Sequence, residues 1–218
     1  MRDARFIAGR RRLLAVFAFP LLLAACATTV PSGETVPAAP RAYHESITLG
    51  GRLSVRYEEN GADQAMHGSF TWEQQSRHIL VTLSSPLGQT LATIAITPGM
   101  STLTQAGQPP RSAPDVDALV ADTLGWPLPV SGLRYWLQGF ALDRQGQPFV
   151  AEPQDNAARV RTRDGWAIHY VSWQAAAERP ALIHPRRIDL ERSTERAGDV
   201  ALRIVIDAWQ PLQENLSP

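Results

Sequence analysis

The sequence predicts a mainly β protein of the α+β class, in which an antiparallel sheet of roughly ten strands curls beneath two short helices. Three observations lead to this fold class. Apolar and polar residues alternate in short runs along most of the chain from residue 47 onward, as they do in half-buried strands. Turn-forming residues separate these runs, which is typical of an antiparallel meander. Helical periodicity is confined to residues 114–140, and sheets of this size tend to curl rather than stay flat.

The first 25 residues have the layout of a secretory signal peptide. Five arginines precede an apolar run, Leu13 to Ala25, which leads into Leu23-Ala24-Ala25-Cys26. These last four residues resemble a bacterial lipobox, in which the cysteine is lipidated and the chain is cut just before it. The alternative is a transmembrane anchor, but the run holds 13 residues, whereas a bilayer core needs about 20. We therefore expect residues 1–25 to be a lipoprotein signal peptide and Cys26 to carry the lipid.

Residues 26–42 are predicted to be the lipidated N-terminus and a flexible tether. The stretch after the cysteine is small, polar and rich in proline, without periodicity. Ala27 directly follows Cys26, at the place where an aspartate holds many bacterial lipoproteins in the inner membrane. In a chain that resembles such lipoproteins, alanine at this position implies export to the outer membrane. We therefore expect a lipid anchor in the outer membrane, with the protein on its periplasmic face.

Five strands are expected before the helices. Their apolar residues recur at every second position, which places one face of each strand in the core. Residues 58–63 supply the first turn, and Pro98-Gly99 supplies a later one. The expected strands are Ile47–Tyr57, Met66–Trp72, Ile79–Leu83, Leu91–Ile96 and Ser101–Gln105.

Two amphipathic helices are expected in the middle of the chain. The first runs from Pro114 to Gly125, with two aspartates in its first turn and the glycine as a stop signal. Ser131 is the predicted N-cap of the second, and a WPLP sequence forces a bend between them. Because each helix has one apolar face, we expect the pair to cover the sheet as a lid. The apolar faces are Val116, Leu119, Val120 and Leu124 in the first helix, and Leu133, Trp136, Leu137 and Phe140 in the second.

Strands are expected to resume after the helices. Residues 159–173 read as a hairpin, with Asp164-Gly165 as a signal for a primed turn. Residues 175–186 are predicted to be a loop, and the alternation returns in 188–191 and 200–209. The folded domain is therefore predicted to span residues 43–211, followed by a loose tail at 212–218.

Composition argues against several classes of function. The chain contains no lysine, which removes the P-loop lysine, Schiff-base chemistry and a Ser-Lys dyad. Its net charge is zero and residues 1–25 hold five Arg and one Asp, which leaves −4 on the rest of the chain. An anionic surface does not suit phosphate binding, so nucleic acid is not an expected partner. Cys26 is the only cysteine, which rules out a disulfide within the chain and any cysteine-based metal site.

The sequence lacks the GxSxG, GxGxxG and HExxH motifs. An envelope hydrolase built on His169 or His184 with a nearby carboxylate is the enzyme alternative, but no serine or metal partner can be recognised for it. We expect no catalytic residue, no metal site and no cofactor. The six tryptophans fit either a solid core or the wall of an apolar cavity.

One loop, residues 84–89, differs from the other connections. Pro86 and Gly88 flank Leu87 and shape a tight excursion, because neither neighbour continues a strand ladder. The leucine either folds back under the sheet or projects as an apolar finger that touches lipid. The pattern alone leaves both readings open.

From Ile47 onward the chain contains, in this order, GRLSVRY, GSFTWEQQ, SPLGQT, ITPG, LGWPLPVSGLRYWLQG, DGWAIHY and IDAWQP. With these motifs, residues 47–209 resemble the LolB family of outer-membrane lipoprotein receptors. SPLG and LGWPLPVSGLRYWLQG are the most specific parts of this likeness. The resemblance implies an unclosed antiparallel β-barrel with a helical lid and an apolar cavity, in agreement with the layout predicted from the pattern.

The resemblance also implies a function. Such a receptor, expected to be a monomer, takes lipoproteins from a soluble periplasmic carrier, LolA, and inserts them into the inner leaflet of the outer membrane. The acyl chains of the client lipoproteins would occupy the cavity. The family's lipidated cysteine falls on Cys26, and its protruding-loop leucine falls on Leu87 between Pro86 and Gly88. The alternatives are a lipid-anchored binding module for another apolar ligand and a purely structural tether.

Overall fold

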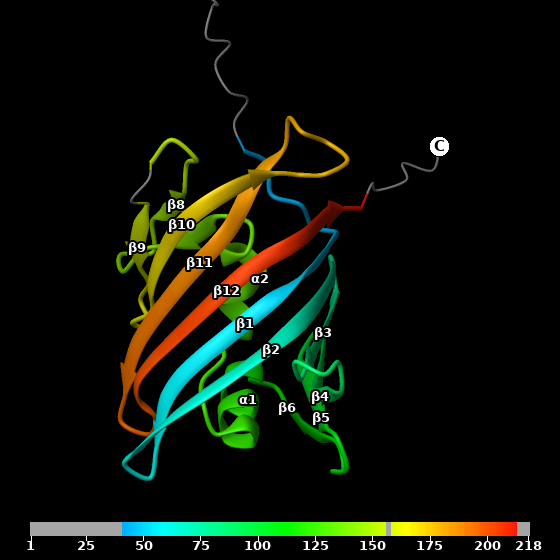
Figure 1. Ribbon diagram of the computed structural model, residues 1–218, viewed down its shortest axis with the longest axis vertical. Helices are drawn as coiled ribbons and strands as arrows, with labels where there is room; N and C mark the ends of the chain where they lie inside the picture. The colour runs from blue at the N-terminus through cyan, green and yellow to red at the C-terminus, as the bar shows by residue number, and fades with distance from the viewer. Residues whose placement is uncertain (1–40, 156–157, 213–218) are drawn as a thin grey trace, which may run out of the picture. The chain divides into compact units, whose positions relative to one another are not determined.

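The computed structural model describes residues 41–155 and 158–212 (Figure 1). The predicted signal peptide, Cys26 and all but the last two residues of the predicted tether lie outside the described residues, as does the tail after residue 212. No helix in the described part of the chain is long and apolar enough to cross a membrane.

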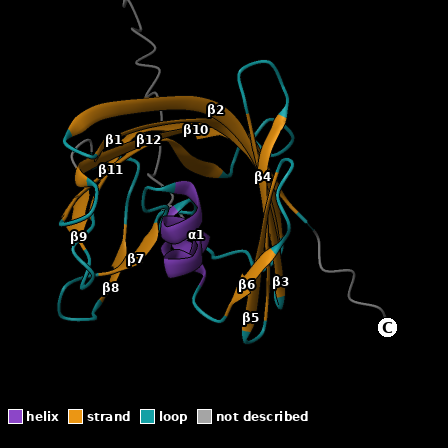
Figure 2. Ribbon diagram, turned by 90° about the horizontal axis from the view of Figure 1, so that it is seen from below, coloured by secondary structure: helices purple, strands orange, loops and turns teal. Residues whose placement is uncertain are grey.

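Most of the described chain forms one antiparallel sheet of ten strands, as the alternation predicts. The first and last long strands pair at its centre, in the order β6-β5-β4-β3-β2-β1-β12-β11-β10-β9, so the edges β6 and β9 stay unjoined and the barrel is open. Figure 2 shows the sheet curving around α1. The bounds are β1 (Ile47–Glu59), β2 (Ala62–Gln75), β3 (His78–Ser84), β4 (Thr90–Thr97), β5 (Met100–Gln105), β6 (Arg111–Ala113), β9 (Arg159–Arg161), β10 (Ala167–Ala175), β11 (Ile183–Thr194) and β12 (Gly198–Pro211).

Several strands differ from the prediction. β6 was not expected, and neither was a separate two-stranded sheet of β7 (Phe140–Leu142) and β8 (Pro148–Val150), because each of these strands is only three residues long. The loop predicted at residues 175–186 is too long, since β11 already begins at Ile183. The β9–β10 hairpin is confirmed, but its primed turn is not: only Gly165 has a positive φ (91°), and a type I′ turn needs two such residues.

Strands β1 and β12 approach unusually closely at a β-bulge between Gly50 and Gly51. A Cβ atom added to Gly51 would lie 2.1 Å from the carbonyl oxygen of Val205, whereas one added to Gly50 would meet nothing closer than 3.7 Å. A side chain is therefore excluded at Gly51, where the β12 backbone occupies the space that a Cβ would need.

Both predicted helices are present. α1 (Val116–Leu124) begins at Asp115, whose Oδ1 accepts from two backbone amides at 2.9 and 3.1 Å, and it ends at Gly125 with φ 84°. α2 (Val130–Trp136) begins after Pro129 and has no side-chain cap, so the prediction of Ser131 as its N-cap is wrong. The prediction of Phe140 on this helix is also wrong, because Phe140 opens β7.

Candidate functional site

The concave face of the sheet and the helices meet mainly through apolar side chains. Between them remains a cavity of about 20 Å³, which is room for roughly one water molecule. The prediction was an apolar cavity under the lid, and in this closed structure the lid side chains fill most of that space. The sheet contributes Leu53, Phe70, Trp72, Val81, Leu83 and Ile204 to the lining of this cavity, and the lid contributes Leu128, Leu133 and Leu137.

The lid residues singled out from the sequence lie where the helices meet the sheet. Apart from Phe140, which lies in β7 and is half-buried, all but one are buried, and Leu124, near the end of α1, is partly buried against the core. Burial of an aliphatic side chain of this size contributes about 1.5–3 kcal/mol. The closed lid is thus held mainly by apolar contact. The buried members are Val116, Leu119, Val120, Leu133, Trp136 and Leu137.

A polar contact joins the two lid helices. The Asp117 carboxylate accepts a hydrogen bond from the Ser131 amide at 3.0 Å and another from the Ser131 hydroxyl at 2.5 Å. Burial raises the pKa of Asp117, and the bonds from Ser131 oppose that rise. The bonds fix α2 to the first turn of α1, so the helices are expected to move as one body.

Residues 41–45, which we call the strap, lie across α2. Arg134 of α2 donates to Glu45 at 2.9 Å, to the Tyr43 hydroxyl at 3.0 Å and to the Ser76 carbonyl oxygen at 3.3 Å. The Tyr43 ring also stacks on Tyr135, with 5.3 Å between ring centroids. This side of α2 is thus held to the strap by hydrogen bonds, an ion pair and a ring contact.

The strap also holds the chain that follows α2. Arg41 donates from Nη2 to the Gln138 carbonyl oxygen at 2.7 Å and from Nη1 to the Ala151 carbonyl oxygen at 2.6 Å. Its guanidinium lies 4.5 Å from the ring centroid of Trp173, and desolvation lowers its pKa. His44 and Gln138 exchange two further hydrogen bonds, at 2.9 and 3.0 Å. Arg41 was assigned to the tether from the sequence, but the packed domain begins with it.

The 85–89 loop projects from the sheet. Its ends are joined by a bond from the Ser85 amide to the Gln89 carbonyl oxygen at 2.8 Å, and Gly88 adopts a φ of 81°. The Leu87 side chain is 87% exposed, so it is not folded under the sheet. Pro86 lies beside it, at the rim of a separate concavity on the outer face.

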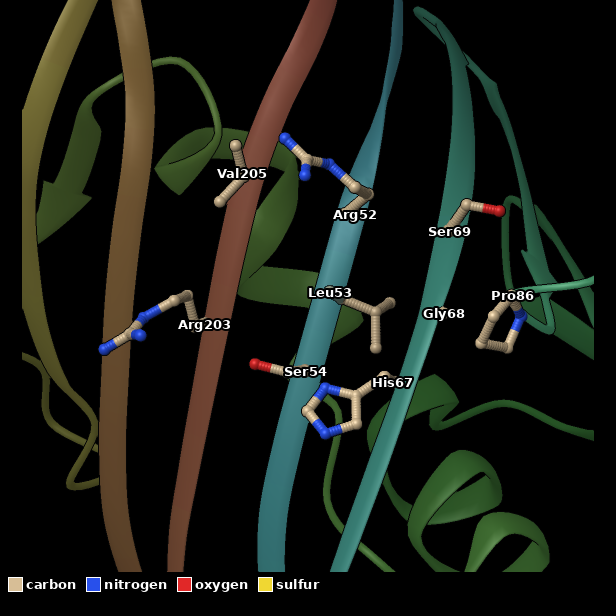
Figure 3. A pocket seen from close by; sticks show the side chains of 9 residues that line it. All are labelled: Arg52, Leu53, Ser54, His67, Gly68, Ser69, Pro86, Arg203 and Val205. Carbon is tan, nitrogen blue, oxygen red and sulfur yellow. The ribbon is translucent and has the colours of Figure 1, made fainter.

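That outer concavity is about 470 Å³ in volume (Figure 3). Arg52, His67 and Arg203 give it a charged and polar lining on the side of the sheet away from the lid. Nearby, partial burial raises the pKa of Asp189, but hydrogen bonds from Arg187 and Arg203 outweigh this and lower it overall. This face is a solvated strand surface.

The histidines of the hydrolase alternative do not form a catalytic arrangement. His184 is buried with its ring stacked on Trp209, 4.9 Å between centroids, and its Nδ1 lies 2.9 Å from the Pro185 carbonyl oxygen. His169 lies opposite Asp189 in the β10–β11 ladder. Among the described residues no group of three or more His, Cys, Asp or Glu side chains is placed to hold a metal ion.

Comparison with known proteins gives a consistent result. A family model described as "Outer membrane lipoprotein LolB" matches residues 45–209. The "Outer-membrane lipoprotein LolB" of Cupriavidus necator is 43% identical over 207 residues, which cover 93% of this chain and 100% of that protein. The protein of the same name from Cupriavidus taiwanensis is 43% identical over 210 residues, covering 93% of this chain and 98% of that one.

Among solved structures, a LolA superfamily protein from Nitrosomonas europaea aligns with 79% of this chain and 89% of its own, at 10% identity and a TM-score of 0.43.

Proposed function

Because the chain belongs to the family of outer-membrane lipoproteins named LolB, we propose that it accepts lipoproteins from a soluble periplasmic carrier, LolA, and inserts them into the inner leaflet of the outer membrane. The family places the protein in the outer membrane as a lipid-anchored lipoprotein with a role in lipoprotein localization. The steps of acceptance and insertion, and Cys26 as the lipidated residue, are parts of the proposal.

One observation carries this proposal: between the sheet and the two helices lies a cavity whose lining side chains are all apolar. An acyl chain gains about 0.8 kcal/mol for each methylene that leaves water, so a lipoprotein does not cross the periplasm without a protein that hides its chains. An apolar interior offers such shelter, and a polar one would not.

The lid has to move for this function. The closed interior has room for about 20 Å³, so a client chain enters only when the lid side chains leave. The helices are short, nine and seven residues, and polar contacts tie them to each other and to the strap. When the helices move away, their apolar side chains leave the interior, and the methylene groups of the acyl chain take their place.

Leu87 is the proposed point of contact with the membrane. It is held outward on a short loop closed by backbone hydrogen bonds, and it is far more exposed than leucine usually is. We propose that it enters the headgroup region where chains are delivered, with Pro86 and Gly88 fixing its direction.

A transfer assay tests the proposal. Carrier loaded with a lipoprotein is mixed with vesicles bearing the protein, without nucleotide, and the vesicles are recovered by flotation. Lipoprotein is expected to move to the vesicle fraction, and empty vesicles are the control. If the protein binds palmitate but leaves lipoprotein on the carrier, it is a binding module for another apolar ligand. If it does neither, it is a structural tether.

A further inference from the structure

A groove of about 1060 Å³ lies on the side of α2 away from the interior, between α2, the β7–β8 hairpin and the turn that joins β9 to β10. We call it the α2 groove. Tyr135, Trp136, Leu142, Phe149 and Val150 contribute most of its apolar lining. Three of them are large apolar side chains left exposed: Leu142 (58%), Tyr135 (46%) and Val150 (41%).

Helix α2 separates this groove from the closed interior. Leu133 and Leu137 line the interior cavity, while Tyr135 and Trp136 line the groove. The Trp136 ring folds back over Gly132, where an added Cβ would lie 2.4 Å from it. The helix therefore needs a glycine at this position to keep the indole flat against its own surface. A single helix thus forms one wall of both spaces.

We propose that the α2 groove is an acyl-chain site, which holds one chain of a client lipoprotein while the lid is still closed. This inference rests on the proposed function. The interior has room for one water molecule in the closed state, and the groove has about fifty times that space at the same helix. A chain bound there lies directly beside the element that has to move before it enters.

The size and chemistry of the groove favour an acyl chain over a protein partner. Ligand sites are concave, mostly apolar and about 300–1,000 Å³ in volume, and this groove, at about 1060 Å³, lies just above that range. A stable protein interface takes about 800 Å² and 20–30 residues on each side, whereas only three large apolar residues are exposed here. The charged residues of its lining are Asp117, Asp143, Arg163 and Asp164.

Photolabelling tests the site directly. The complete chain with Cys26→Ala, which carries no lipid of its own, is irradiated with palmitic acid that bears a terminal diazirine, and labelled peptides are mapped by mass spectrometry. Labelling is expected on residues 135–150, saturable and competed by unlabelled palmitate. Leu142→Asp is expected to reduce it about tenfold. Leu91→Asp, at a leucine 38% exposed on β4, is the control and is expected to leave it unchanged.

Three results would overturn the inference: label only on interior residues such as Leu53, Val81 and Ile204, labelling that does not saturate, or equal loss in both aspartate variants. Thermal unfolding of each variant checks that its fold is retained, which is expected because both leucines are exposed. The transfer assay is run in parallel on the unmodified protein. Transfer without groove labelling refutes the site alone, and labelling without transfer refutes the proposed function.

Discussion

Replacing Arg134 with methionine is expected to loosen the lid and leave the sheet intact. Arg134 is the residue of α2 that makes polar contacts with the strap and with β2–β3: an ion pair with Glu45, a hydrogen bond to the Tyr43 hydroxyl and one to the Ser76 carbonyl oxygen. Methionine keeps most of the aliphatic stem and its packing but removes all three contacts. We call these three contacts of Arg134 the latch. The variant therefore tests the latch and leaves the apolar face of the helix unchanged.

The expected magnitude follows from exposure. A hydrogen bond to a charged group contributes about 1.5–3 kcal/mol when buried, and an exposed ion pair contributes about 0–1 kcal/mol. The Arg134 side chain is 24% exposed and that of Glu45 is 51% exposed, so the pair lies between these limits. We take about 2 kcal/mol as the contribution of the three contacts together to the closed state. Their loss is therefore expected to raise the open fraction of the lid about 30-fold.

Hydrogen exchange measures this effect locally. The α2 amides, including that of Leu137, which donates to the Leu133 carbonyl oxygen, are expected to exchange about 30-fold faster in Arg134→Met. The matched control is Arg52→Met, which removes an exposed arginine–carboxylate pair on the outer face and is expected to leave α2 unchanged. Unchanged α2 exchange, or an equal rise in β1 and β12, would refute the assignment of Arg134 as a latch.

Three further outcomes are expected. Leu87→Glu should block insertion into vesicles while sparing acceptance from the carrier, and Leu87→Met should preserve both; normal delivery by the glutamate variant in the flotation assay would contradict the membrane-contact role. Gly51→Ala should destabilise the protein by about 1–3 kcal/mol in urea unfolding, because its Cβ has no space, and Gly50→Ala should cost much less. The lowered pKa of Asp189 contributes stability that is full above pH 3.8 and is lost as the pH falls from there through the native pKa. Asp189→Asn should therefore reduce the pH dependence of the free energy of unfolding in that acid range only.

The long strands and α1 were predictable from the sequence for a local reason. A strand with one face in the core repeats its apolar residues every two positions, as β1 does from Ile47 to Tyr57 and β12 from Val200 to Ile206. β6, β7 and β8 are three residues each, so no repeat can develop in them. The N-cap residue of α2 is Pro129, two residues before the serine predicted for that position, and proline has no side-chain acceptor that a cap prediction could recognise.

The apolar character of the interior could be predicted from the sequence, but the contacts of the strap could not. Apolar faces on the strands and on the lid imply an apolar interior, but they do not say how much of it the lid fills. The strap depends on hydrogen bonds between residues far apart in the chain, such as Arg41 with Gln138 and Arg134 with Tyr43. No local pattern records such pairs. The one available signal was an arginine and a tyrosine at the end of an otherwise small, proline-rich tether.

The filled interior supports the proposed direction of transfer. Three leucines of the lid, Leu128, Leu133 and Leu137, occupy the space that an acyl chain would take. Exposing each of them costs about 2 kcal/mol, or about 6 kcal/mol together. An acyl chain of about 15 methylenes gains about 12 kcal/mol by leaving water for any apolar medium. When the chain binds in the protein, the cost of opening the lid offsets roughly half of this free-energy gain. When the chain enters a bilayer, no lid has to open and the whole gain remains. In the proposed function, release to the membrane is then downhill without nucleotide, because the closed lid competes with the chain for the same space.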